Sequence, residues 1–236
     1  MQIWTSIRYE LKIIYAPVKW FICVFFVILI PFVFYAPTRM DVINLSEIYV
    51  PLIGIVLFSD IMLIEQTYHA AEIVYLAKRK RAISLIIRFL IMILILAVSL
   101  GSSVLLTNAG LISRLDEGDR IHYLNMLGIV VPGSLFVGSI GMTFANLLSS
   151  TSIGYLIGIV YWAYWMISTS MEQMNLLNLF SFANGYSYTT SKMILLSCVL
   201  GLLFLNMIVL EWSPLQRRIR LSKRKGENRK RLIKNN

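Results

Sequence analysis

The chain is constrained above all by a series of long apolar segments that carry almost no charge. A helix needs roughly 20 apolar residues to cross the hydrocarbon core of a membrane. Six segments approach or reach this length: Trp20–Thr38, Ile48–Ile64, Ile83–Thr107, Tyr123–Ala145, Ser152–Met171 and Met193–Leu210. The sequence therefore predicts an all-α membrane protein with six transmembrane helices, which would form one membrane domain over residues 18–212.

Composition agrees with a lipid environment and limits what else the chain can contain. Of the 236 residues, 58% are hydrophobic and 14% are charged, whereas soluble domains average about 45–50% apolar and about 25% charged residues. Six crossings would use about half of the chain, so a soluble catalytic domain of typical size does not fit in the remainder. No Gly-Lys pair occurs in the sequence, which excludes the usual phosphate-binding loop of nucleotide hydrolases.

The distribution of basic residues predicts the orientation of these helices. If all six segments cross, eighteen of the 22 Lys and Arg residues fall on one side of the membrane and four on the other. Cytoplasmic loops carry the excess of Lys and Arg, so we expect a multi-pass cell-membrane protein with both termini in the cytoplasm. The basic tail, residues 213–236, would contact anionic lipid headgroups rather than nucleic acid.

Residues 1–17 differ from the predicted spans because their apolar side chains recur along one stripe of a helix. The stripe consists of Ile3, Trp4, Ile7, Leu11, Ile14 and Tyr15. Arg8 and Lys12 lie on its flank, and polar residues lie behind it. This pattern predicts an amphipathic helix that lies in the membrane interface.

Asp60 is the only acidic residue well inside a predicted span. Intramembrane acids usually face protein or a water-filled cavity, so Asp60 is a candidate for the lining of a transport path. Arg88 enters the next predicted span at a similar distance from the cytoplasmic side. The two side chains are therefore expected to form an ion pair.

The fifth apolar segment carries both a packing motif and a cluster of aromatic residues. Gly154 and Gly158 form a small-xxx-small step, which permits close approach of a second helix. Four aromatic residues lie near the middle of the segment: Tyr161, Trp162, Tyr164 and Trp165. They lie deeper than an interfacial aromatic belt, so the sequence leaves two interpretations: they line a transport path, or they serve ordinary packing in a displaced span.

The segment between the second and third predicted spans, residues 65–82, combines acidic, apolar and basic residues. Those that could contact a partner are Glu65, His69, Glu72, Leu76, Lys78 and Arg81. Together with the six apolar segments and the N-terminal helix, this segment resembles the cytoplasmic loop of the type-two ATP-binding-cassette exporter permeases. In that family a Glu opens the loop, and a Gly-Thr-x-Glu group, a leucine-rich turn, a proline and two basic residues follow.

Glu65 and Glu72 stand at the two acidic positions of that family pattern, whereas His69 replaces the usual glycine and Lys78 a frequent proline. The resemblance implies that residues 65–82 form a coupling loop that docks on a separate ATPase subunit. The chain itself would have no catalytic residue, metal or cofactor, because ATP and Mg²⁺ would be bound by that partner. The resemblance further implies that two permease chains pair to enclose the path.

An external segment, residues 172–190, is long for a simple connection and rich in Leu and Phe. In the exporter family the corresponding region folds back into the membrane, and we expect the same here. The implied function is the export of a peptide, an antibiotic or a lipid-like molecule, which would include self-immunity to an antimicrobial peptide.

Two other functions remain open from the residues alone. Glu65, His69 and Glu72 are spaced so that a helix would project all three within about 60°, which is compatible with the metal site of an intramembrane protease. A partner-free ion-coupled carrier is the other alternative, and it would rely on Asp60 and Arg88.

Overall fold

The computed structural model of the chain is all-α, which confirms the predicted class. It describes residues 2–14, 16–34, 36, 38–64, 81–110, 120–168, 177–184 and 188–211. Within these ranges the chain forms seven helices: α1 (Gln2–Ile14), α2 (Pro17–Val33), α3 (Arg39–Phe58), α6 (Arg81–Asn108), α7 (Tyr123–Leu148), α8 (Thr151–Ser168) and α9 (Tyr188–Glu211).

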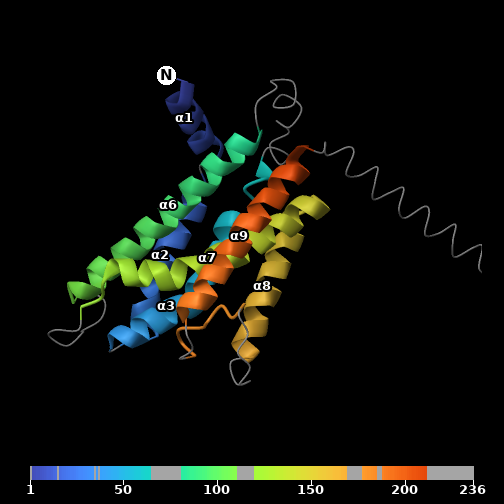
Figure 1. Cartoon of the computed structure of the whole chain (residues 1–236). Coiled ribbons are helices and arrows are strands. Elements are labelled where there is room, and N and C mark those ends of the chain that lie inside the picture. Colours follow the sequence, from blue (N-terminus) through green and yellow to red (C-terminus); the bar gives the residue numbers. More distant parts are fainter. Residues whose placement is uncertain are drawn as a thin grey trace, which may run out of the picture.

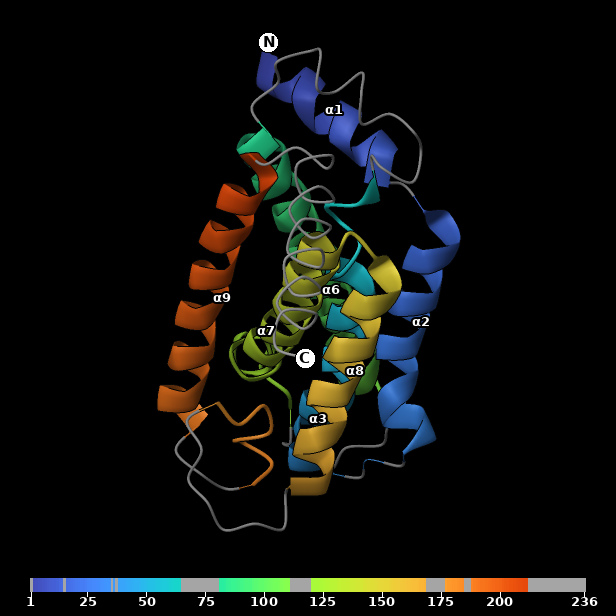
Figure 2. The same cartoon turned by 90° about the vertical axis from the view of Figure 1, so that its right-hand side faces the viewer.

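The helices form a bundle around α7, which packs against α3, α8, α9 and α6 (Figure 1). Helix α2 packs on α3 and α6, away from α7. Helix α1 lies across one end of the bundle, and its axis is bent by 84° from that of α2 (Figure 2). A helix perpendicular to its neighbour at the bundle end is the arrangement expected of a segment that follows the membrane surface.

Four helices are long and apolar enough to cross a membrane, namely α3, α6 from Ala82, α7, and α9 up to Leu210. The bent pair α1–α2, from Ile7 to Ile30, is a fifth candidate if it counts as one broken span. Helix α8 falls outside this set because of its mean hydropathy: several of its 18 residues are Tyr and Trp, which are less apolar than Leu or Ile. These helices are those of a multi-pass membrane protein.

The predicted boundaries are wrong at the first two apolar segments. Helix α2 ends at Val33, and Thr38 belongs to the next helix as its N-cap. The Thr38 hydroxyl accepts the Asp41 N–H and the Asp41 carboxylate accepts the Thr38 N–H, each at 3.2 Å, a capping box that fixes the helix start. Helix α3 therefore begins nine residues before the predicted Ile48 and ends before Asp60.

The other boundaries are closer to the prediction. Helices α6 and α7 begin within two residues of the predicted starts, and α9 begins five residues before the predicted Met193. Ser149 takes a left-handed conformation, with φ at 51°, between α7 and α8. This connection has only two residues, and α7 and α8 pack against each other.

Small residues allow α7 to approach α3 and α8 closely. A Cβ atom on Gly54 of α3 would overlap the carbonyl of Ser134 on α7, and one on Gly138 of α7 would lie 2.6 Å from the carbonyl oxygen of Gly54. On the other side of α7, a Cβ atom on Gly154 of α8 would lie 2.5 Å from the carbonyl oxygen of Gly141. In lipid, where apolar solvent surrounds the helices, this van der Waals packing is a main source of helix association.

Gly54→Ala tests the contribution of this packing. The new methyl group would meet backbone atoms of Ser134, which cannot rotate away, so α3 and α7 would have to separate. We expect a loss of about 1–3 kcal/mol of stability, measured as a lower midpoint of thermal unfolding of the purified protein in detergent. Gly201→Ala is the matched control, because a Cβ atom there meets nothing within 4 Å; equal effects of both substitutions would contradict the packing described here.

Candidate functional site

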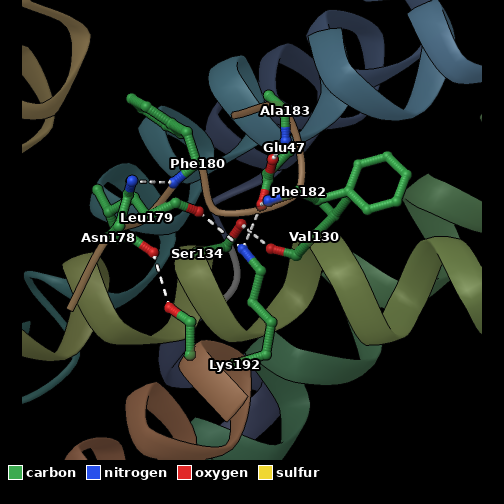
Figure 3. Close-up of polar contacts among 10 residues, drawn as sticks. Glu47, Val130, Ser134, Asn178, Leu179, Phe180, Phe182, Ala183 and Lys192 are labelled. Atoms are coloured by element: carbon green, nitrogen blue, oxygen red, sulfur yellow. Dashed lines mark hydrogen bonds and ion pairs between the residues drawn. The ribbon is translucent and has the colours of Figure 1, made fainter. Parts of the chain in front are cut away.

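A deeply buried pair of opposite charges joins α3 to α9. The Lys192 ammonium donates a hydrogen bond to the Glu47 carboxylate (Figure 3). Glu47 is 1% exposed and Lys192 is 4% exposed. Charged groups lose several kcal/mol of hydration when they are buried, so such a pair persists only where further hydrogen bonds satisfy it.

A turn of the chain, residues 177–184, supplies those hydrogen bonds. The backbone N–H groups of Phe182 and Ala183 donate to the two oxygens of Glu47, at 3.2 and 2.8 Å. Lys192 donates a second hydrogen bond, at 2.7 Å, to the carbonyl oxygen of Leu179. The turn therefore closes over the ion pair, and Leu179 and Phe180 within it are fully buried. We call Glu47, Lys192 and residues 177–184 the α3–α9 clamp.

Two further contacts hold the turn in its conformation. The Asn178 side chain accepts the N–H of Phe180 at 2.9 Å, and the Ser191 hydroxyl donates to the Asn178 carbonyl at 3.2 Å (Figure 3). Residues 177–184 belong to the predicted external segment, residues 172–190. The described part of that segment turns inward between α3 and α9.

The α3–α9 clamp was not predicted from the sequence. In the predicted topology, Lys192 is one of the four basic residues on the external side, and Glu47 stands just before the second span. Helix α3 in fact begins at Arg39, so Glu47 lies two turns inside it, and the statement that Asp60 is the only acid inside a span is wrong. The signal that could have found Glu47 is the Thr38-x-x-Asp41 capping box, which marks the true start of the helix.

The sequence predicted an ion pair between Asp60 and Arg88, but Asp60 has a different partner. It lies in the turn after α3 and accepts a hydrogen bond from Lys19 of α2 at 2.7 Å. The side chain of Tyr155 on α8 also lies beside the Asp60 carboxylate. Asp60 therefore links α2 and α8 to the end of α3, in a site that is only partly buried.

Arg88 has a different acidic partner, which the sequence analysis did not identify. Its Nε donates to Glu10 of α1 at 2.6 Å, and its Nη1 donates to the carbonyl oxygen of Ile61 at 3.1 Å. Ser84, one turn earlier on α6, donates to the other oxygen of Glu10 at 2.6 Å. Glu10 and Arg88 are 0% and 3% exposed. We call this group the α1–α6 joint, since it fixes the N-terminal helix to α6 and to the end of α3.

The aromatic residues of α8 do not form one common surface. The indole N–H of Trp162 donates to the carbonyl oxygen of Ile48 on α3 at 2.7 Å, and the hydroxyl of Tyr161 donates to the carbonyl oxygen of Leu177 at 3.3 Å. Trp165 is buried, whereas Tyr164 is 56% exposed. Tyr161 and Trp162 thus tie α8 to α3 and to the turn of the clamp.

Asp60 lies apart from this aromatic group. It is beside Tyr155, and Tyr161 is six residues further along α8, about 9 Å along the helix axis. The five residues predicted to line a path are therefore divided between two places: Asp60 lies near Tyr155, and the four aromatic residues lie further along α8. Gly154 of the same helix faces α7, and Gly158 faces the side chain of Ile55 on α3.

A polar contact between α7 and α9 lies among the apolar residues of the bundle. The Asn206 amide donates to Thr143 at 2.8 Å, and the Asn146 amide donates to the Asn206 carbonyl oxygen at 3.1 Å. All three residues are at least 96% buried. Side-chain hydrogen bonds between membrane helices contribute about 0.6 kcal/mol each on average, so this contact sets the register of α9 on α7.

A cavity of about 590 Å³ lies between α6, α7 and α9. Its lining includes Lys192 and is otherwise mostly apolar. Ile129, Pro132 and Lys192 are buried at its base, whereas Leu124 and Met193 at its edge are 78% and 64% exposed. The cavity therefore opens to the outside of the bundle beside the clamp.

Most of the residues predicted to couple to a partner lie outside the described part of the chain. These are Glu65, His69, Glu72, Leu76 and Lys78, while Arg81 is the first residue of α6. Within the described ranges, no three His, Cys, Asp or Glu side chains come together as a metal site would require. The basic tail, residues 213–236, also lies outside the described residues.

Comparison of the chain with protein-family models, with curated proteins and with solved structures gives no match. The geometry described above is therefore the basis for assigning a function to this multi-pass membrane protein.

The energetic role of the α3–α9 clamp can be measured with a double-mutant cycle. Glu47→Gln or Lys192→Met alone would leave one buried charge without its partner, which typically costs about 3–5 kcal/mol. We expect each single variant to lower the thermal unfolding midpoint in detergent strongly. The double variant should be less destabilised than the sum of the two, because it leaves no unpaired charge.

Lys19→Met and Asp60→Asn give the matched comparison for this cycle. That pair is more exposed, with side-chain exposures of 17% and 24%, and exposed ion pairs contribute only about 0–1 kcal/mol. The clamp would not be a coupled unit under two conditions. The losses of stability caused by the Glu47 and Lys192 substitutions would simply add in the double variant, and each loss would be no larger than those caused by the Lys19 and Asp60 substitutions.

Proposed function

We propose that the chain is the permease subunit of an ATP-driven exporter, with six membrane crossings and both termini in the cytoplasm. The energy source would be a separate ATP-binding-cassette subunit, which binds ATP and Mg²⁺. The cargo would be a peptide, an antibiotic or a lipid-like molecule, and self-immunity to an antimicrobial peptide is one use of such export.

The observation that carries this proposal is the α1–α6 joint. Arg88 binds the Ile61 carbonyl and the Glu10 carboxylate, so it connects the end of α3, the start of α6 and the N-terminal helix. The described residues that flank segment 65–80, Ile64 and Arg81, lie close in sequence to Ile61 and Arg88 of this joint. A force applied to that segment by an ATPase would therefore act on three helices at once.

In the proposed mechanism, two permease chains enclose the path and alternate between inward-open and outward-open states. ATP binding by the partner shifts the populations of these states, since it binds one of them more tightly. The α1–α6 joint would transmit the movement on the cytoplasmic side. The α3–α9 clamp, toward the other end of α3, would hold the external side closed until α3 moves relative to α9.

The orientation of the chain is the first test of this proposal. In a background without Cys23 and Cys198, a single cysteine is introduced by Ala77→Cys in the predicted coupling loop or by Ser113→Cys in the segment between α6 and α7. We expect a membrane-impermeant maleimide to label Ser113→Cys in intact cells, and to label Ala77→Cys only after the membrane is permeabilised. Labelling of Ala77→Cys in intact cells would overturn the proposed coupling mechanism.

Association with an ATPase is the second test. The chain is co-expressed with a candidate ATP-binding-cassette subunit from the same genome and is purified through a tag on the chain. We expect the two to co-purify, and Glu72→Lys to reduce the recovered ATPase about tenfold, because a reversed charge inside an interface costs more than 1.4 kcal/mol. Glu117→Lys, in the segment on the opposite side, is the control; equal losses in both variants would contradict docking through residues 65–82.

A further inference from the structure

We propose that the cavity between α6, α7 and α9 is a binding site for one acyl chain of a membrane phospholipid, with the lipid phosphate held at its polar end. This inference needs only that the three helices lie in a membrane, and it does not depend on an ATPase partner.

The surroundings of the cavity identify an apolar, membrane-derived occupant. The three helices that form its walls are all candidate membrane spans. Outward-facing side chains of the same helices are large and apolar, among them Leu94 of α6 (63% exposed) and Phe204 of α9 (66% exposed). An opening on such a face borders lipid, and an empty apolar cavity of this size would lose the dispersion contacts that an acyl chain supplies.

The dimensions of the cavity fit part of one leaflet. Its lining on α9 runs from Tyr188 to Leu196, a separation of eight positions or about 12 Å along a helix. The hydrocarbon core of a bilayer is about 30 Å thick, so the cavity spans less than half of it. Its volume of about 590 Å³ also lies within the range of about 300–1,000 Å³ typical of small-molecule sites.

The polar end of the cavity has donors suited to a phosphate group. Helices α7 and α9 both begin beside it, at Tyr123 and Tyr188, and helix N-termini attract anions through their free N–H groups. Asn125 and Thr189 line the same end.

Lys192 connects this end of the cavity to the α3–α9 clamp. Its ammonium group has three N–H donors, of which Glu47 and the Leu179 carbonyl take two. These two bonds hold the Lys192 side chain in place at the wall of the cavity.

Gly128 offers a substitution that closes the cavity without disturbing the bundle. It lines the cavity, and a Cβ atom placed on it meets nothing within 4 Å. In Gly128→Phe the ring would therefore extend into the space of the acyl chain. Gly201→Phe is the matched control, because a Cβ atom on Gly201 also meets nothing within 4 Å, but this residue of α9 is not part of the cavity lining.

The experiment uses the full chain in phosphatidylcholine vesicles that contain a small fraction of phosphatidylglycerol with a diazirine in one acyl chain. After illumination, labelled residues are mapped by mass spectrometry. We expect the label per residue on 124–132 and 188–196 to exceed that on the lipid-facing part of α9, residues 200–208. Gly128→Phe should lower this excess about tenfold, and Gly201→Phe should leave it unchanged.

Several outcomes would overturn the proposal. One is equal labelling of the cavity and of residues 200–208, which would mean that the cavity holds no lipid. Another is labelling of the cavity that appears only when the protein is diluted in the vesicles, which would mean that a second copy of the chain fills the space at higher density. If Gly128→Phe fails to fold, Gly128→Leu occupies the same space with a smaller side chain, and undiminished labelling in that variant would also reject the site.

Discussion

The α3–α9 clamp shows the constraint on which the rest of this structure depends: in an apolar environment, a charge or a free backbone group must find its partner within the protein. Glu47 and Lys192 meet that requirement only together, and only with the N–H and carbonyl groups of residues 177–184. One contact therefore fixes two membrane helices and the turn that precedes α9. Without it, the N–H groups of Phe182 and Ala183 and the carbonyl of Leu179 would lose the hydrogen bonds described above.

Close helix packing supplies the rest of the stability, and α7 is central to it. Its small residues face α3 on one side and α8 on the other, so that backbones rather than long side chains are in contact. Such surfaces have little freedom to slide, because each carbonyl lies against a particular glycine. The hydrogen bond between Asn146 and Asn206 fixes the position of α9 along α7. The bundle thus combines a rigid centre, α3–α7–α8, with outer helices held by a few specific bonds.

The apolar segments of the sequence were sufficient to predict the class of fold and the approximate position of each helix. For α6 the prediction was nearly complete, since only Arg88 interrupts a long apolar run. The prediction from hydropathy failed at the start of α3. The capping box at Thr38 begins this helix in a polar stretch, so Glu47 lies within the helix and inside the bundle. The partners of Asp60 and Arg88 could not be predicted, because they depend on how α1 and α2 fold back over residues that are distant in the chain.

The hydrogen bond from Arg88 to the Ile61 carbonyl has a consequence for the evolution of the intervening segment. This bond joins the residues on either side of segment 62–87. Bringing the two ends of that segment together costs conformational entropy, and the contacts between the helices offset this cost. The amino acids between them need not favour closure of the loop. Ser84 and Leu85 of that interval are held by the bundle, but residues 65–80 could change with a partner without altering the membrane helices.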